Sequence, residues 1–286
     1  MSRPRIAIAT CTDYAALKVD DELLREELAA RDVETASVVW DREGNELGSF
    51  DACLVRSTWD YHEKHEEFLA WTRRTEAAMP LWNDAKTIAW NSNKTYLRQL
   101  AERGVPIVPT VWLQRSSRAS LDDLLAERGW EEAVVKPVVD LGARNLSRVR
   151  PGEGEEALTR ILARHDAMVQ PFLPSLEAQG ELSLIYIDGN FSHTVRKRPA
   201  PGDFRVQSIW GGTFEPAKPT PDQVEIAQRA LAQVDPSPLY ARADLVDDLN
   251  GRPCLIELEL IEPNLYLTQH PLAVGVLADA IVARLR

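Results

Sequence analysis

Short apolar runs and amphipathic stretches alternate along the first third of the chain. Ile6–Ala9 and Ala52–Arg56 are brief hydrophobic runs with polar borders, as expected for buried strands. Asp20–Ala30 has helical periodicity and carries acidic residues in its first turn, where the helix dipole favours them. A second helix is predicted to start near Asp60. This alternation predicts a small α/β domain with a parallel sheet over residues 1–90.

The pattern changes after residue 90. Asn91–Lys94 opens a predicted helix that Gly104 ends and Pro106 cannot continue. Irregularly spaced strands and helices follow, and the turns at 188–190 and 247–251 indicate hairpins between neighbouring strands. The predicted strands cover residues 108–113, 133–137, 168–170, 182–187, 191–196, 239–246 and 254–260. This part is predicted to be α+β with antiparallel sheets, divided into segments 91–172 and 173–286.

Composition narrows the class of protein. The 286 residues are 44% hydrophobic and 27% charged, and no apolar run is long enough for a membrane span, so a cytoplasmic location is expected. The three cysteines are isolated in the sequence, which argues against a zinc site or a disulfide framework. A formal net charge of −11 argues against nucleic-acid and membrane partners. Such a chain needs a local basic pocket if it is to bind a polyphosphate.

The last predicted hairpin carries the strongest chemical signal. Glu257 and Glu259 share one face of a strand, and Arg242 and Asp244 share a face of its partner strand. Carboxylates this close repel one another unless a cation or a proton neutralises them. Mg²⁺ bound by Asp244, Glu257 and Glu259 is therefore predicted, and a solvated ion pair with Arg242 is the alternative.

Several cations stand in unusual places. Lys136 ends the apolar run 133–135, and Lys94 lies in the first turn of its predicted helix, where free N–H groups favour an anion. Arg196 and Arg205 belong to a short stretch rich in cations and glycine, although Arg196–Arg198 alone fits a solvated turn. Neither a P-loop nor a dinucleotide fingerprint occurs, so a nucleotide must be bound in another way.

The order of these motifs resembles the ATP-grasp superfamily, and within it the glutathione-synthetase-like and ribosomal-protein-S6-modifying ligases. The resemblance covers about residues 90–286, and the segment Arg56–Tyr61 is similar to the subgroup that contains the D-cycloserine-forming ligase. The motifs, in order, are Lys94, Val135–Pro137, Gln170–Leu173, Gly180–Glu181, Arg196, Gly202–Arg205, Gly211–Gly212, Asp244 and Glu257–Glu259. The resemblance implies an ATP-grasp fold: an N-terminal pre-grasp domain and two α+β subdomains that grip ATP.

The same resemblance implies a role for each matching residue. Lys94 and Lys136 contact the ATP phosphates, and Glu181 accepts hydrogen bonds from the ribose. The adenine meets the strand that carries Gln170, Phe172 and Leu173. Arg196 and Arg205 stabilise the transferring phosphoryl group, while Asp244, Glu257 and Glu259 hold Mg²⁺, or Mn²⁺ in its place.

Two departures from the family pattern stand out. Many relatives carry asparagine where Glu259 stands, so Glu257 is the firmer metal ligand of the two. The phosphate-covering loop of many relatives is rich in glycine and serine, whereas residues 139–145 here contain one glycine and one acid.

The N-terminal domain is predicted to select a small-molecule substrate. Arg56 ends the second strand, and ligands of open α/β sheets bind beyond the carboxyl ends of strands. Ser57 and Asp60 are the neighbouring candidates, with helix capping as the alternative role. The expected reaction joins a phosphorylated carboxylate to a nitrogen nucleophile, and the cycloserine resemblance suggests a ureido amino acid that cyclises. A small-molecule kinase and a regulatory nucleotide-binding module are the alternatives, and a homodimer is compatible with the family.

Overall fold

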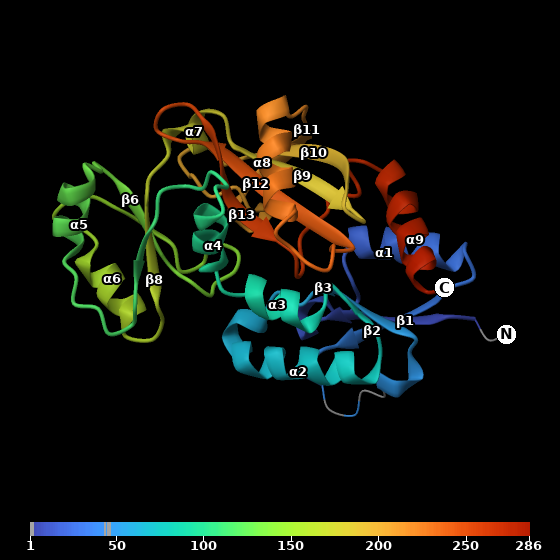
Figure 1. The fold of residues 1–286 in the computed structure, drawn as a ribbon. Coiled ribbons are helices and arrows are strands. Elements are labelled where there is room, and N and C mark those ends of the chain that lie inside the picture. The colour runs from blue at the N-terminus through green and yellow to red at the C-terminus, as the bar shows by residue number, and fades with distance from the viewer. Residues whose placement is uncertain (1–2, 43, 45–46) are drawn as a thin grey trace.

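Three β-sheets, each built from a separate stretch of the chain, organise the fold (Figure 1). The computed structural model describes residues 3–42, 44 and 47–286. The sheets occupy residues 5–82, 111–171 and 181–259. The division into segments 1–90, 91–172 and 173–286 stays a prediction, and each segment contains one of the sheets.

The N-terminal sheet is parallel, as the alternating pattern predicts. Its strand order is β2-β1-β3-β4. The strands are β1 (Arg5–Thr10), β2 (Glu34–Val39), β3 (Ala52–Ser57) and β4 (Leu81–Trp82), and the helices are α1 (Val19–Ala29), α2 (His65–Ala78) and α3 (Ala85–Asn91). The sequence pattern does not predict β2 and β4, because three of the six residues of β2 are polar, its first four residues are not buried, and β4 has only two residues.

The second sheet forms a lobe with its own core. Its antiparallel order is β5-β8-β6-β7, and helices α5 and α6 pack their leucines and isoleucine onto it. Ser120 caps α5 by accepting from the backbone N–H of Asp123, and Gly129 ends it with φ 65°. The elements are β5 (Val111–Leu113), β6 (Ala133–Pro137), β7 (Ser147–Val149), β8 (Ala167–Pro171), α5 (Leu121–Arg128) and α6 (Glu155–Leu162).

The third and largest sheet is antiparallel, with the order β11-β10-β9-β12-β13. Its strands are β9 (Glu181–Ile187), β10 (Asn190–Arg198), β11 (Thr213–Pro216), β12 (Tyr240–Asp247) and β13 (Pro253–Glu259). The helices around it are α4 (Tyr96–Glu102), α7 (Pro174–Ala178), α8 (Pro221–Leu231) and α9 (Leu272–Arg284). None of the helices in the described part of the chain is long and apolar enough to cross a membrane.

The two faces of the large sheet differ in chemistry. Leu182, Leu184 and Tyr186 of β9 point to one side, where they join the core beneath α4 and α8. Because side chains alternate along a strand, Ile185 and Ile187 point the other way, into the core shared with the N-terminal sheet and α9. Further along this second face the residues become charged, and there the cavity described below opens.

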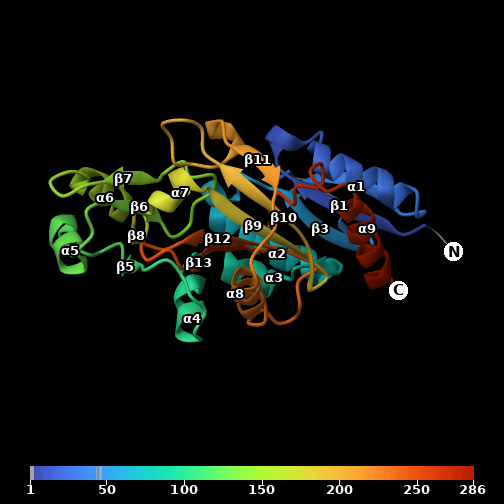
Figure 2. The ribbon, with the colours of Figure 1, turned by 90° about the horizontal axis from the view of Figure 1, so that it is seen from above.

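Buried hydrogen bonds fix the N-terminal domain to the large sheet. The Asn83 side chain donates to the carbonyl oxygens of Tyr240 (2.8 Å) and Leu260 (2.7 Å), and accepts from the N–H of Leu239 (2.7 Å). The hydroxyl of Tyr240 donates to the carbonyl of Val55 at 2.6 Å. Helices α1 and α9, from opposite ends of the chain, pack side by side in both views (Figures 1 and 2). The first domain therefore has a fixed position over one end of the large sheet.

Replacing Asn83 with alanine tests this attachment. Asn83→Ala leaves two carbonyls and one N–H without a partner in a buried place, so we expect the free energy of unfolding to fall by about 2–4 kcal/mol. Denaturant unfolding measures it. The control is Asn190→Ala, because Asn190 is exposed and donates to a carbonyl two residues away. Equal losses in the two variants would show that the Asn83 bonds do not secure the domain.

Candidate active site

A cavity of ≈ 480 Å³ lies where the three parts of the chain meet. Its wall includes Trp59 and Tyr61 from the N-terminal domain, Lys136 and Gln170 from the lobe, and Asp244 from the large sheet. This volume is in the range of small-molecule and cofactor sites. A ligand that fills this cavity can therefore contact the N-terminal domain, the lobe and the large sheet.

Cations concentrate in the cavity although the chain is acidic overall. Eight of them line it: Lys18, Lys64, Lys94, Lys136, Arg144, Lys197, Arg205 and Arg242. Carboxylates line it as well: Asp13, Asp41, Asp60, Glu63, Asp140, Glu181, Asp244, Glu257, Glu259 and Glu262. The cavity is therefore of mixed charge, and its cations are the groups that can face a polyphosphate in a chain with a formal net charge of −11.

Three carboxylates meet on the floor of the cavity. Asp244 of β12 lies opposite Glu257 of β13, and Arg242 lies opposite Glu259. A β-bulge sets this register, because Leu245 pairs with Leu255 and leaves Ile256 as the extra residue. Ligand oxygens of Asp244, Glu257 and Glu259 lie within 4.8 Å of one another. The predicted hairpin placed these groups within reach, and the bulge sets them face to face.

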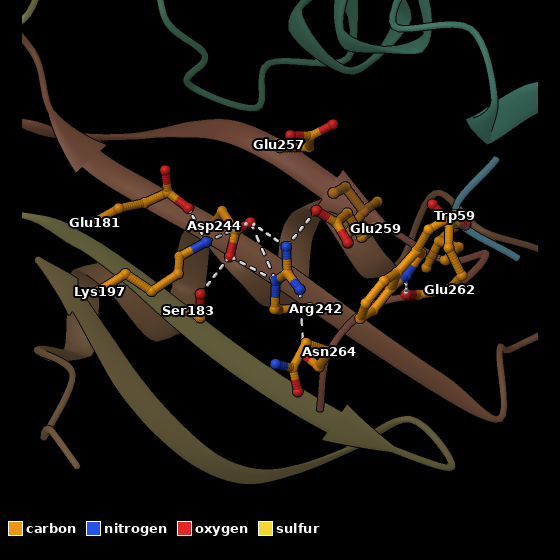
Figure 3. A network of polar contacts seen from close by, with 12 residues as sticks. Trp59, Glu181, Ser183, Lys197, Arg242, Asp244, Glu257, Glu259, Glu262 and Asn264 are labelled. Carbon is orange, nitrogen blue, oxygen red and sulfur yellow. Dashed lines mark hydrogen bonds and ion pairs between the residues drawn. The ribbon is translucent and has the colours of Figure 1, made fainter. Parts of the chain in front are cut away.

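Asp244 is the most enclosed of the three carboxylates and is held by three donors (Figure 3). It accepts from the hydroxyl of Ser183 at 2.5 Å and from the guanidinium of Arg242 at 3.0 Å. The ammonium of Lys197 lies 3.0 Å from it and also pairs with Glu181. Burial opposes the charge of Asp244, but Arg242 and Lys197 outweigh burial and lower its pKa.

The two glutamates face the cavity and are less well compensated. Glu257 pairs with Lys94 at 3.0 Å; burial opposes its charge, but Lys94 outweighs burial and lowers its pKa. Glu259 pairs with Arg242, yet burial together with Glu257 and Asp244 raises its pKa to about 7. Glu259 is therefore the carboxylate of the three whose charge its neighbours compensate least, and a cation bound beside it would favour its charged form.

Lys94 and Lys136 lie beside this cluster. Lys94 does not start a helix, because α3 ends at Asn91 and α4 begins at Tyr96; it lies in the turn between them. Its ammonium also donates to the carbonyl of Asp140 at 2.7 Å. Lys136 has no direct ion pair among the described residues, and its pKa is lowered, chiefly by burial. An unpaired buried ammonium suits an anionic ligand such as a phosphate.

The loop 139–145 is held in place despite its single glycine. Asp140 accepts from the side-chain amide of Asn145 at 2.9 Å, which closes the loop on itself. The indole N–H of Trp210 donates to the carbonyl of Gly142 at 2.9 Å, and the guanidinium of Arg205 stacks on the Trp210 ring at 3.5 Å. The loop from the lobe and the loop from the large sheet thus meet over the cavity.

Most residues singled out from the sequence line this cavity. They are Asp60, Lys94, Lys136, Gln170, Leu173, Glu181, Arg205, Asp244, Glu257 and Glu259. Four others, Arg56, Ser57, Phe172 and Arg196, do not. Phe172 packs instead beneath the guanidinium of Arg148, 3.5 Å from its ring centre.

The predicted substrate role of Arg56 and Ser57 does not fit the structure. Arg56 is 3% exposed and its guanidinium pairs with Asp21 of α1 at 2.7 Å. The hydroxyl of Ser57 donates to the same carboxylate at 2.6 Å. Both side chains therefore fasten α1 to β3. Asp60 does reach the cavity, but it makes no cap and accepts from the indole N–H of Trp40 at 2.7 Å.

The sequence predicts that Arg196 of β10 lies in the site, but the structure places its neighbour Lys197 there instead. The Arg196 side chain donates to the carbonyl of Gln179 at 3.0 Å, on the side of β10 away from the cavity. Lys197, one residue later on the strand, points to the opposite face and enters the charge network. The apolar residue Val195 was the available signal, since it belongs to the core on that same face.

Comparisons with known proteins agree with this geometry. Residues 6–83 match the family model "D-cycloserine synthetase DcsG, N-terminal domain", and residues 104–248 match "Prokaryotic glutathione synthetase, ATP-grasp domain". The cycloserine biosynthesis protein DcsG of Streptomyces lavendulae is 30% identical over 98% of this chain and 99% of its own. Glutathione synthetase of Prochlorococcus marinus is 28% identical over 67% of this chain and 68% of its own. The crystal structure of D-cycloserine synthetase DcsG has a TM-score of 0.90 at 28% identity, covering 99% of this chain and 100% of that one.

Fold, site and sequence together define the class: the chain belongs to the ATP-grasp ligases and is an ATP-dependent ligase. Within that class it is similar along its whole length to D-cycloserine synthetase, and both the N-terminal domain and the ATP-grasp part share in this similarity.

The adjacent residues Lys197 and Arg196 provide a matched test of the corrected site. Lys197→Met removes a cation that Asp244 and Glu181 require, so we expect kcat/KM for substrate-dependent ADP release to fall at least about 100-fold. Arg196→Met makes the same chemical change on the opposite face and should stay within about threefold. Denaturant unfolding of both variants separates lost activity from lost folding. A larger loss in Arg196→Met would contradict the placement of β10.

Proposed function

We propose that this ligase phosphorylates the carboxylate of an amino acid derivative and then closes a ring by attack of a nitrogen in the same molecule. The observation that carries the proposal is the shared cavity, in which an acid cluster and a set of cations face a wall supplied by the N-terminal domain. That domain also resembles the one in D-cycloserine synthetase. D-Cycloserine contains a cyclic amide, which such a ring closure produces.

Asp244, Glu257 and Glu259 fit a Mg²⁺ ion, with Mn²⁺ as the alternative. Carboxylate oxygens are the ligands that Mg²⁺ prefers, and two of these side chains keep 29% and 25% of their surface exposed toward the cavity. Asp244 already accepts from three donors, so Glu257 and Glu259 have more free lone pairs. A divalent cation here would offset their mutual repulsion and neutralise phosphate charge.

The nucleotide is assigned to the side of the cavity formed by the lobe. Lys136 makes no direct ion pair within the described part of the chain, and Lys94 can contact a phosphate without leaving Glu257. Gln170 and Leu173 lie on the same wall and suit the adenine edge and face. Glu181 lies further along, where a carboxylate can accept from ribose hydroxyls, although it is already paired with Lys197.

The chemistry then takes two balanced steps. A carboxylate oxygen of the substrate attacks the γ-phosphorus, the bond to the bridging oxygen breaks, and ADP leaves an acyl phosphate behind. The substrate nitrogen attacks the acyl carbon, loses its proton, and phosphate departs as the carbon–oxygen bond breaks. Arg205 and Arg242 line the cavity and offer guanidinium groups to the charge that develops on phosphoryl and acyl oxygens.

A small-molecule kinase would use the first step alone, and a regulatory module would use neither step. Free phosphate, a phosphorylated substrate, or no ADP release distinguishes the three possibilities. The homodimer and the cytoplasmic location stay predictions from the sequence.

Oxygen labelling tests the acyl phosphate directly. With ¹⁸O in the substrate carboxylate, we expect one labelled oxygen in the released phosphate, because the carboxylate oxygen that accepts the phosphoryl group departs with it. Mass spectrometry of the phosphate measures the label. Complete retention in the product would exclude carboxylate activation.

Removing one charge from the proposed metal site tests its role. Glu257→Gln keeps the size of the side chain but removes a ligand charge, so we expect kcat/KM to fall at least about 100-fold and the Mg²⁺ requirement to rise. ADP release against Mg²⁺ concentration measures both effects. Glu215→Gln, at an exposed carboxylate on β11, is the control. Normal turnover of Glu257→Gln at limiting Mg²⁺ would mean that the carboxylate is structural.

A further inference from the structure

The cavity continues beyond the metal carboxylates, between the segment that follows β13 and the N-terminal domain. Glu262 and Asn264 lie on that segment, and Trp59 comes from the loop after β3. The indole N–H of Trp59 donates to the backbone carbonyl of Glu262 at 3.0 Å (Figure 3). This hydrogen bond joins the two walls and fixes the backbone that carries the Glu262 carboxyl.

Glu262 is a buried acid that has no counter-ion among the residues the structure describes. Its residue is 4% exposed, and its Oε2 atom has no hydrogen-bond partner, yet the side chain borders the cavity. A buried carboxyl in this situation is costly for the folded protein. Burial, followed by the nearby charge of Glu259, raises its pKa well above the usual range. No ion pair of this carboxyl and no hydrogen bond to its Oε2 atom, among the described residues, explains why an acid is buried at this position.

Two cations of the cavity, Arg242 and Lys94, already pair with other groups. Arg242 contacts Asp244, Glu259 and the carbonyl of Asn264. Lys94 is held by Glu257 and by the carbonyl of Asp140. Glu262 is also not among the carboxylates whose oxygens cluster within 4.8 Å, so the proposed metal site does not include it.

The wall near Glu262 combines two aromatic rings with one lysine. Tyr14 and Trp59 contact edge to face with ring centres 4.9 Å apart, and the ammonium of Lys18 lies 4.4 Å from the Trp59 ring centre. These groups border the cavity near Glu262 and carry no negative charge. Other carboxylates, such as Asp13 and Asp60, also line the cavity, but among the described residues Glu262 is the lining acid that has a buried oxygen without a hydrogen-bond partner.

We propose that Glu262 is the specificity residue for the amino group of the substrate, which it binds as an ammonium, and that Trp59 positions it through the hydrogen bond to its backbone. The inference rests on the proposed function and narrows its substrate class to carboxylates that carry an amine. A substrate ammonium bound at Glu262 would lie beyond Glu259, toward the N-terminal domain. The carboxylate of the same substrate would then be free to face the phosphoryl donor.

The first test uses the protein without ligand. Glu262→Gln removes an uncompensated buried acid, so we expect its unfolding midpoint to equal or exceed that of the wild type. A structural role predicts the opposite. A clear drop in the midpoint, with Glu63→Gln unchanged, would overturn the proposal; Glu63 is an exposed carboxylate that also borders the cavity.

The second test measures ADP release with paired probes. The probes are β-aminooxy-D-alanine, its N-carbamoyl (ureido) derivative, and the corresponding compounds without the α-amine, at saturating Mg-ATP. We expect the wild type to use only compounds that carry the α-amine. For these, Glu262→Gln should lose about 100-fold in kcat/KM, mostly through KM, because a buried charged contact is lost. The KM for ATP should stay within about twofold, since Glu262 does not contact the nucleotide.

The outcomes separate this inference from the proposed function. If the wild type turns over the amines and Glu262→Gln does so equally well, the role of Glu262 is wrong and the ligase proposal stands. Equal use of the compounds without the amine by the wild type would likewise overturn the role of Glu262. If the wild type binds Mg-ATP but releases no ADP with any probe, the ring-closing function and its amine subsite fail together.

Discussion

The removal of several charged groups from water on one face of the large sheet is the constraint on which the site depends. Asp244 is 1% exposed and survives as an anion because Arg242, Lys197 and Ser183 all donate to it. Isolated buried charges are expensive, and a network is tolerated only when its members satisfy one another. The surrounding strands must therefore hold a fixed register, which the long antiparallel pairings of β9, β10, β12 and β13 provide.

The charge of Asp244 is compensated by its neighbours, whereas several charged groups that border the cavity are not fully compensated. Glu259 keeps a pKa of about 7, Lys136 has no ion pair among the described residues, and Glu262 has an oxygen without a partner. Each of these groups borders the same space. The incompletely compensated charges on the protein are therefore of both signs, and they concentrate in one cavity, as is common at functional sites.

The N-terminal domain has a second function besides completing the core. Asn83 and Tyr240 anchor it to the large sheet, and this anchorage brings Trp59 and Tyr61 to the cavity wall. Arg56 and Ser57 serve the same end, because their bonds to Asp21 hold α1 against β3. Rigid packing of this kind keeps the residues of the cavity wall in fixed positions, and positioning of reactants supplies much of the rate of an enzymatic reaction.

The sequence by itself determined the class of fold, the order of the motifs and most of the charged residues of the site. Hydrophobic periodicity and turn residues are local features, so they predict strands, helices and hairpins without a structure. The sequence placed the carboxylates of β12 and β13 together, and it singled out Lys94 and Lys136, which both line the cavity. Tertiary structure alone decided which face of β10 meets the cavity, and so replaced Arg196 with Lys197. It also decided that Arg56 pairs with Asp21 and that the Oε2 atom of Glu262 has no hydrogen-bond partner among the described residues. The physical reason is that burial and pairing are properties of contacts between distant segments, and the local pattern of a strand does not specify them.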